Sequence, residues 1–258
     1  MASAAAAALF RVTTTPTHLD AALGLFLCEA AGQAIAQRGA FVLCTSGGSM
    51  PPQLAAALAW AHGAGLPLRC EQWHVFYADE RHVALAHADS NHAATLAALA
   101  ARAPWFPPAA LRPIDPCLPL EACAAAYGAA YAAATGGRGA DAVLLGCGPD
   151  GHTASLFPGH ALLAAAPGGS GFAAIADSPK APPARVTLTL PALAAARAVA
   201  FVALGEGKAR LVADIAAGTP EALALPAARV RAAGGQPPTW FLDAASASLL
   251  QGASGASS

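Results

Sequence analysis

Short apolar runs alternate with longer segments rich in alanine and leucine along this chain of 258 residues. The runs at 40–44, 73–77, 142–145 and 199–204 have the length and the β-branched or aromatic content of buried strands. The segments between them have the composition of helices, and one predicts a helix from about residue 52 to 62. Alternating strands and helices indicate an α/β protein with a mostly parallel sheet flanked by helices.

The length of the chain predicts one large domain. We expect this domain to span residues 1–251 and to be followed by a flexible tail at 252–258, where glycine, alanine and serine dominate. The small residues at 168–171 predict a second flexible segment, within a loop.

Composition limits the possible partners. Charged residues make up 11% of the chain and the net charge is -1, whereas a surface that binds nucleic acid or anionic lipid needs clustered positive charge. Much of the 56% apolar content is alanine, which favours helices rather than membrane spans, and the alanine-rich start lacks the basic region of a signal peptide. We therefore expect a cytoplasmic monomer or weak homodimer with a small-molecule substrate and no nucleic-acid or membrane partner.

The cysteines and histidines predict neither disulfides nor a metal site. The six cysteines form no C-x-x-C pair, and several lie in apolar, strand-like runs. The histidines at 82, 87 and 92 are five residues apart and would not share one helix face.

Polar or glycine-rich residues directly follow each predicted strand. Open α/β sheets place their ligand crevice at the carboxyl ends of the strands, so this placement indicates a site. The first such turn contains Ser46, Gly47, Gly48 and Ser49, and prolines follow at the start of the next helix. Free backbone N–H groups, hydroxyls and the positive helix end suit a phosphate. An ordinary βα turn that needs glycine for its backbone angles is an equal alternative.

Two carboxylates and a guanidinium follow the strand at 73–77. The planar guanidinium of Arg81 suits bidentate contact with phosphate, and Asp79 could orient a substrate hydroxyl or act as a base. An internal salt bridge that only shapes the loop is the alternative. Ser90, shortly after, resembles the N-cap of the next helix.

A literal G-x-G-x-x-G occupies residues 146–151, after the strand at 142–145. Its context argues against a dinucleotide site, because Asp150 would repel a pyrophosphate and an alanine run stands where a ribose-binding acid is expected. What remains is Asp150 close to His152. Histidine is well suited to accept a proton near neutral pH, and a nearby carboxylate can fix its tautomer. A structural histidine is the alternative.

The chain contains no G-x-S-x-G, so a serine nucleophile is unsupported and an activated water becomes the predicted nucleophile. Three further cations adjoin turns or strand ends, and solvated surface charge is their alternative role. They are Lys180, Arg185 and Lys208.

Together these motifs resemble the 6-phosphogluconolactonase family, in the family's order and over nearly the whole chain. The matching segments are TSGGS at 45–49, YADER at 77–81, DSN at 89–91, LLGCGPDGHTASLFPGH at 144–160, DSPKAPPARVTLTLP at 177–191, GEGKA at 205–209 and WFLD at 240–243.

The resemblance implies a three-layer α/β fold of the sugar-phosphate isomerase type, a modified Rossmann-like arrangement with helices on both faces of a mostly parallel open sheet. It implies hydrolysis of 6-phospho-D-glucono-1,5-lactone to 6-phospho-D-gluconate, a step of the oxidative pentose phosphate pathway, without metal or organic cofactor. By the same similarity His152 looks like the general base, and Asp79 matches an acid/base position of related deaminases. The residues that look like a phosphate site are Gly47, Gly48, Ser49, Arg81, Arg185 and Lys208.

The resemblance completes a mechanistic hypothesis. His152 deprotonates a water that attacks C1, with Asp150 as its nearest partner, and backbone N–H groups at 148–151 or a cation stabilise the oxyanion. Ser46 and Lys180 join the residues expected to bind substrate.

Two other functions are open. A glucosamine-6-phosphate isomerase/deaminase carries a glutamate five residues after the corresponding histidine, whereas this chain has Phe157 there, so ring-opening isomerisation is disfavoured. A sugar-phosphate sensor would carry a DNA-binding segment, and the residues before the first predicted strand have no basic recognition-helix pattern.

Overall fold

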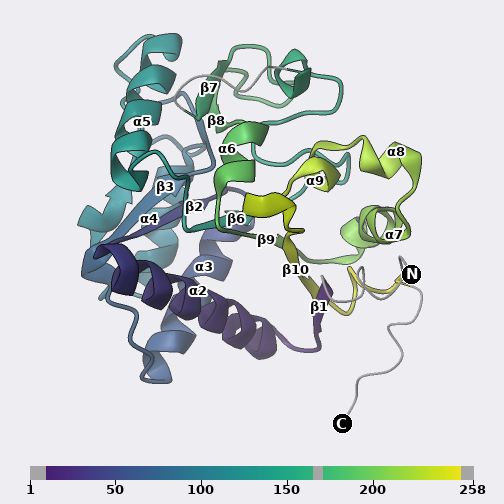
Figure 1. The fold of residues 1–258 in the computed structure, drawn as a ribbon, viewed down its shortest axis with the longest axis horizontal. Coiled ribbons are helices and arrows are strands. Elements are labelled where there is room, and N and C mark those ends of the chain that lie inside the picture. The colour runs from purple at the N-terminus through teal and green to yellow at the C-terminus, as the bar shows by residue number, and fades with distance from the viewer. Residues whose placement is uncertain (1–9, 165–170, 251–258) are drawn as a thin grey trace.

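Seven parallel strands form the central sheet of the computed structural model, which describes residues 10–164 and 171–250 (Figure 1). Across the sheet the order is β1, β10, β9, β6, β2, β3 and β5. The four runs expected as strands lie side by side at its centre, as β9, β6, β2 and β3. The strands are β1 (Phe10–Thr13), β2 (Phe41–Thr45), β3 (Trp73–Tyr77), β5 (Leu111–Arg112), β6 (Ala142–Leu145), β9 (Ala198–Ala203) and β10 (Thr239–Asp243).

Helices cover both faces of this sheet, so the predicted α/β class and its layers are confirmed. Successive strand residues point to opposite faces: Leu43 and Val75 join the core beneath α2, α3 and α4, while Cys44 and Phe76 join the core beneath α5 and α6. The helices are α2 (Pro16–Arg38), α3 (Met50–Gly63), α4 (Asn91–Arg102), α5 (Leu120–Thr135), α6 (Leu190–Ala195), α7 (Ala209–Ala217), α8 (Pro220–Leu223) and α9 (Pro226–Arg229). Single turns of 3-10 helix are η1 (Cys70–Gln72), η2 (Pro108–Ala110), η3 (Ala161–Ala164), η4 (Glu206–Lys208) and η5 (Ala233–Gly235).

A second, antiparallel sheet of three strands packs on the α5 side (Figure 1). It consists of β4 (Asp79–Arg81), β8 (Arg185–Leu188) and β7 (Phe172–Ile175), with β8 in the middle. Its register pairs Asp79 with Thr187 and Arg81 with Arg185. This pairing brings the residues after β3 against a segment about a hundred positions later in the chain.

Helix α2 is long and apolar enough to span a membrane by length and composition alone, the one such helix among the described residues. Leu19, Leu23 and Leu27 are nevertheless buried in the core between the helix and the sheet. Gly24 lets α3 approach closely, because a Cβ there would lie 2.9 Å from the carbonyl oxygen of Ala57. These contacts make α2 a core helix of the fold.

Two expectations concern residues outside the described ranges: the flexible tail at 252–258 and most of the small-residue loop at 168–171. The six cysteines all lie within those ranges, and each is a free thiol.

Candidate functional site

The carboxyl ends of β3, β2, β6 and β9 lie at one edge of the central sheet. Thr45 pairs with Tyr77 on one side and with Leu144 on the other, and Leu145 pairs with Phe201. The glycine turn, the Asp79 segment, the His152 segment and the Gly205 turn therefore all leave the sheet at the same edge, as ligand sites in open α/β sheets do.

The glycine turn leads directly from β2 into α3. Ser46 N–H donates to the carbonyl of Leu144 (3.0 Å), and Gly48 adopts a φ of 63° that favours glycine. Among the described residues, none accepts a hydrogen bond from the backbone N–H of Gly48 or Ser49. The hydroxyl of Ser46 is buried and has no hydrogen-bond partner within the part of the chain that the structure describes. Unused donors at the start of a 14-residue helix are the features that suit a phosphate oxygen.

Gly47 is required by a close contact with a neighbouring helix. A Cβ at this position would overlap the side-chain amide of Asn91, the first residue of α4. Asn91 is 2% exposed, and its Nδ2 donates to the carbonyl of Asp79 (2.7 Å). Asn91 thus joins the glycine turn to the segment that carries Asp79.

Glu80 caps the start of α4. Its buried carboxylate accepts hydrogen bonds from the backbone N–H groups of Arg81, Asn91 and His92 at 2.7 to 2.8 Å. Burial raises the pKa of Glu80, and these N–H groups act in the opposite direction. Ser90 accepts from the N–H of Ala93, so its predicted role as the N-cap is confirmed.

Asp79 is buried beside a serine and an arginine. Ser155 Oγ donates to Asp79 Oδ2 (2.8 Å), and Arg185 Nη1 lies 3.7 Å from the same oxygen. Arg185 Nη1 also donates to Ser155 Oγ (3.2 Å), which closes a triangle of three buried polar side chains. Sequence reasoning missed Ser155, whose only signal was its place three residues after His152.

Most donors of Arg185 are engaged within the protein. Nε donates to the carbonyl of Pro182, and Nη2 donates to the carbonyls of Lys180 and Ala181. Burial lowers the pKa of Arg185, while the charge of Asp79 raises it. Arg81 is less engaged: Nη1 donates to the carbonyl of Asp89 (2.6 Å), and its buried Nε finds no partner among residues 10–164 and 171–250.

His152 and Asp150 form a direct pair in the segment after β6. His152 Nδ1 contacts Asp150 Oδ1, and the imidazole stacks on Phe157 with ring centroids 5.0 Å apart and planes at 27°. Burial lowers the pKa of His152, and Asp150 opposes that effect. Burial would raise the pKa of Asp150, but hydrogen bonding to His152 brings it below its usual value.

The glycines of the G-x-G-x-x-G segment fit this pair. A Cβ on Gly148 would overlap both the imidazole of His152 and the carboxylate of Asp150. Gly151 has a φ of 78°, and a Cβ there would lie 2.6 Å from Leu225. The N–H groups of Gly148 and Gly151 donate to the carbonyls of His152 and Gly148, so neither is free for an oxyanion. Two of the N–H groups in the expected oxyanion site at 148–151 are therefore engaged within the segment itself.

Lys180 and Lys208 lie in different segments at the carboxyl edge of the sheet. Lys180 Nζ lies 3.1 Å from His152 Nδ1 and 3.4 Å from Asp150 Oδ2. Lys208 lies in η4 after β9, half-buried. Burial raises the pKa of the Cys147 thiol to about 11, and the positive charge of Lys208 acts against that rise.

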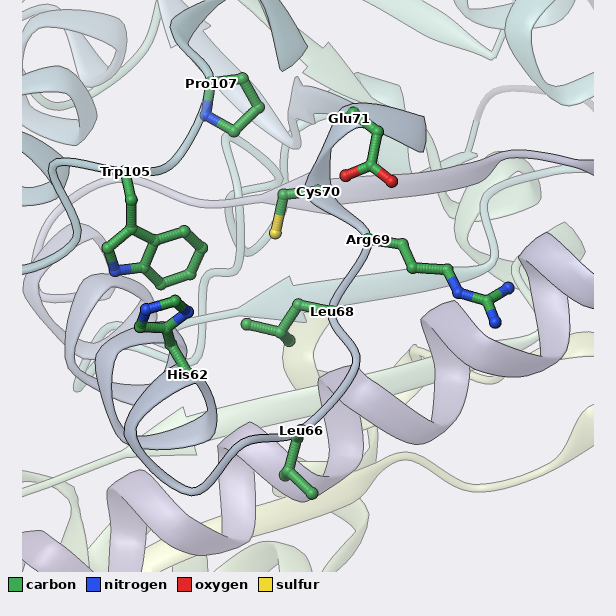
Figure 2. A pocket seen from close by; sticks show the side chains of 8 residues that line it. All are labelled: His62, Leu66, Leu68, Arg69, Cys70, Glu71, Trp105 and Pro107. Atoms are coloured by element: carbon green, nitrogen blue, oxygen red, sulfur yellow. The ribbon is translucent and has the colours of Figure 1, made fainter.

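A separate pocket of about 350 Å³ lies at the opposite edge of the sheet, where η1 leads into β3 (Figure 2). Trp105 stacks on His62 at its side, with ring centroids 4.2 Å apart. None of the predicted site residues lines this pocket.

Comparison with known proteins identifies the family of this chain. The family model described as "Glucosamine-6-phosphate isomerases/6-phosphogluconolactonase" matches residues 14–240. The chain belongs to this family. It is 41% identical to the 6-phosphogluconolactonase of Rattus norvegicus, over 96% of each chain.

Solved structures of this family share the fold. A crystal structure of devB protein has a TM-score of 0.77 and 31% identity, covering 93% of this chain and 98% of the other. A 6-phosphogluconolactonase from Trypanosoma brucei has a TM-score of 0.72 and 28% identity, covering 93% and 97%. The resemblance seen in the sequence motifs is thus confirmed.

Proposed function

We propose that this protein hydrolyses 6-phospho-D-glucono-1,5-lactone to 6-phospho-D-gluconate in the oxidative pentose phosphate pathway, with no metal or organic cofactor. The observation that carries the proposal is the His152–Asp150 pair at the edge of the sheet where the glycine turn also lies. The relative from Rattus norvegicus is named 6-phosphogluconolactonase, the enzyme that catalyses this reaction. We expect the protein to act in the cytoplasm as a monomer or weak homodimer.

The glycine turn holds the phosphate of the substrate. The free N–H groups of Gly48 and Ser49 and the end of α3 supply donors and positive potential, and Arg81 and Lys208 supply charge. Arg185 contributes positive charge rather than direct hydrogen bonds, because its side chain is buried and most of its donors are engaged. Anchoring the phosphate leaves the C1 carbonyl to be oriented toward His152, which lowers the entropic barrier to attack.

His152 acts as the general base. Its Nδ1 faces Asp150, so Nε2 takes a proton from water while the water oxygen bonds to C1. The tetrahedral oxyanion collapses, the bond between C1 and the ring oxygen breaks, and the proton on Nε2 passes to that oxygen. Asp79 adds a negative charge that favours the transient imidazolium.

Phe157 argues against the deaminase alternative. It stacks on His152 at the position where the deaminases carry a glutamate, so no carboxylate is available there to complete their relay. Release of ammonia from glucosamine 6-phosphate, measured directly, tests this alternative.

The main experiment compares wild type with His152→Ala on freshly generated lactone, using a rapid assay corrected for spontaneous hydrolysis. We expect wild type to be far faster than background and His152→Ala to lose roughly two orders of magnitude or more in kcat. Near-normal turnover by His152→Ala would remove His152 as the base. A wild-type rate equal to background would overturn the proposed function.

A further inference from the structure

Lys180 contacts the Nδ1 side of the His152 ring. Its Nζ is 3.1 Å from Nδ1, the nitrogen that also contacts Asp150 Oδ1, and 3.4 Å from Asp150 Oδ2. In an imidazole the two nitrogens point to opposite sides of the ring. Lys180 therefore contacts the nitrogen other than the one assigned to the water.

The contacts of Nδ1 determine where the ring proton sits. Both Asp150 and Lys180 lie at this one nitrogen, but an ionised carboxylate can only accept and an ammonium can only donate. A proton on Nδ1 satisfies Asp150 Oδ1, while the ammonium of Lys180 forms an ion pair with Asp150 Oδ2. The opposite tautomer would leave the carboxylate facing a lone pair. The arrangement therefore favours Nε2 as the unprotonated nitrogen.

The side chains of Ser178 and Arg185 fix the main chain of Lys180. Ser178 Oγ accepts from Lys180 N–H (3.2 Å) and donates to Lys180 O (2.9 Å), and buried Arg185 donates to the same carbonyl (2.8 Å). A fixed backbone restricts the positions that the half-exposed side chain can reach.

We propose that Lys180 is a positioning residue that acts through Asp150 to keep His152 in the Nδ1–H tautomer, with Nε2 free to accept a proton. This inference rests on the proposed function and gives Lys180 a task other than holding phosphate. Four charged groups influence the imidazole: Asp150 and Lys180 directly, Asp79 at longer range, and Arg185 through Asp79. Lys180 is the cation nearest the ring and opposes protonation of His152 in the resting enzyme.

The test compares full-length wild type, Lys180→Met and Lys180→Arg, each with ¹⁵N-labelled histidine. The His152 signals are identified by their loss in His152→Ala, and no substrate is present. We expect wild type to show the Nδ1–H tautomer at neutral pH. In Lys180→Met the titration midpoint of His152 should rise by about half to one pH unit, as expected for the loss of one partly exposed charge at this distance. Lys180→Arg should restore most of the wild-type midpoint.

Kinetics on the lactone separate positioning from phosphate binding. We expect Lys180→Met to lower kcat several-fold and to move the acid limb of the pH profile upward with little change in KM. The matched control is Lys208→Met, which should raise KM and leave the His152 midpoint unchanged.

An unchanged tautomer and midpoint in Lys180→Met would overturn the inference, and so would a large rise in KM at constant kcat. If wild type fails to hydrolyse the lactone but the midpoint still shifts, the coupling of Lys180 to His152 stands and the proposed function fails.

Discussion

The imidazole of His152 stacks on the ring of Phe157, with planes at 27° and centroids 5.0 Å apart. Phe157 is buried, and the guanidinium carbon of Arg185 lies 5.8 Å from the centre of its ring. The proposed base therefore rests on an apolar surface instead of facing water on all sides. Such a surface disfavours the charged form of histidine.

The first prediction concerns pH. Because burial lowers the pKa of His152 below its ordinary value of 6.5, the base stays unprotonated in mildly acidic solution. We expect the acid limb of kcat/KM to have a midpoint below 6.5, measured by background-corrected initial rates. A midpoint at or above the ordinary value would contradict this account of the ring's environment.

The free energy of unfolding should also depend on the protonation of His152. The native pKa of His152 is depressed, so at pH values between it and 6.5 the unfolded chain binds the proton more readily than the folded one. The contribution of His152 to the free energy of unfolding is therefore fully present above pH 6.5 and is lost as the pH falls toward the native pKa. His152→Gln should show a smaller loss of stability over this range in urea unfolding.

The second prediction uses two glycines of one segment. A Cβ in Gly148→Ala would overlap His152 and Asp150, whereas one in Gly146→Ala would meet no atom within 4 Å. We expect Gly148→Ala to lower kcat by about tenfold to a hundredfold, since small displacements of catalytic groups are costly. Gly146→Ala should stay close to wild type in rate and melting temperature. Equal rates for the two variants would contradict the fit of the pair against Gly148.

The third prediction concerns the substrate's phosphate. Gly47→Ala would push against Asn91, which is buried and bonded to the main chain of Asp79, so the turn has to shift. We expect KM for the lactone to rise about tenfold, the loss of roughly one charge-assisted hydrogen bond. The control is Gly207→Ala beside Lys208, where an added Cβ meets nothing within 4 Å. A changed kcat with a constant KM would show that the turn affects the chemical step and not the binding of the phosphate.

The fourth prediction concerns the buried triangle of Asp79, Ser155 and Arg185. Asp79→Asn leaves Arg185 without its counter-charge, and breaking one side of a buried pair costs about 3 kcal/mol. Ser155→Ala should cost less, about 1 to 3 kcal/mol, because only hydrogen bonds are lost. Urea unfolding measures both. If Asp79→Asn proves as stable as wild type, the contact with Arg185 is not holding this region together.

Much of the central sheet was predictable, because β2, β3, β6 and β9 are short, continuously apolar runs, as strands buried on both faces must be. The predicted helix at 52–62 proved to be α3 (Met50–Gly63), which begins earlier because proline fits the first turn. The antiparallel sheet as a whole was not foreseen. Asp79, Glu80 and Arg81 have no apolar pattern, and they become a strand only because β8 lies beside them.

The candidate site also contains some contacts that the sequence could suggest and others that it could not. Asp150 and His152 are two positions apart, so the sequence alone could suggest their pairing. Ser155 bonds to Asp79, 76 positions away, and Lys180 meets His152, 28 positions away. Such contacts depend on how loops return over the sheet, and no local pattern encodes that path. The contacts of Arg185 with Asp79 and Ser155 were hidden for the same reason.

The edge strand β1 pairs with β10 alone, although the two stand at opposite ends of the described chain. During synthesis β1 cannot pair until the chain has been made as far as β10. Helix α2, which follows β1, can pack on β2 and α3 long before that. Closing a contact between such distant segments is slow. We expect the final docking of β1 to be a late event in folding, after the crevice formed by the inner strands is already in place.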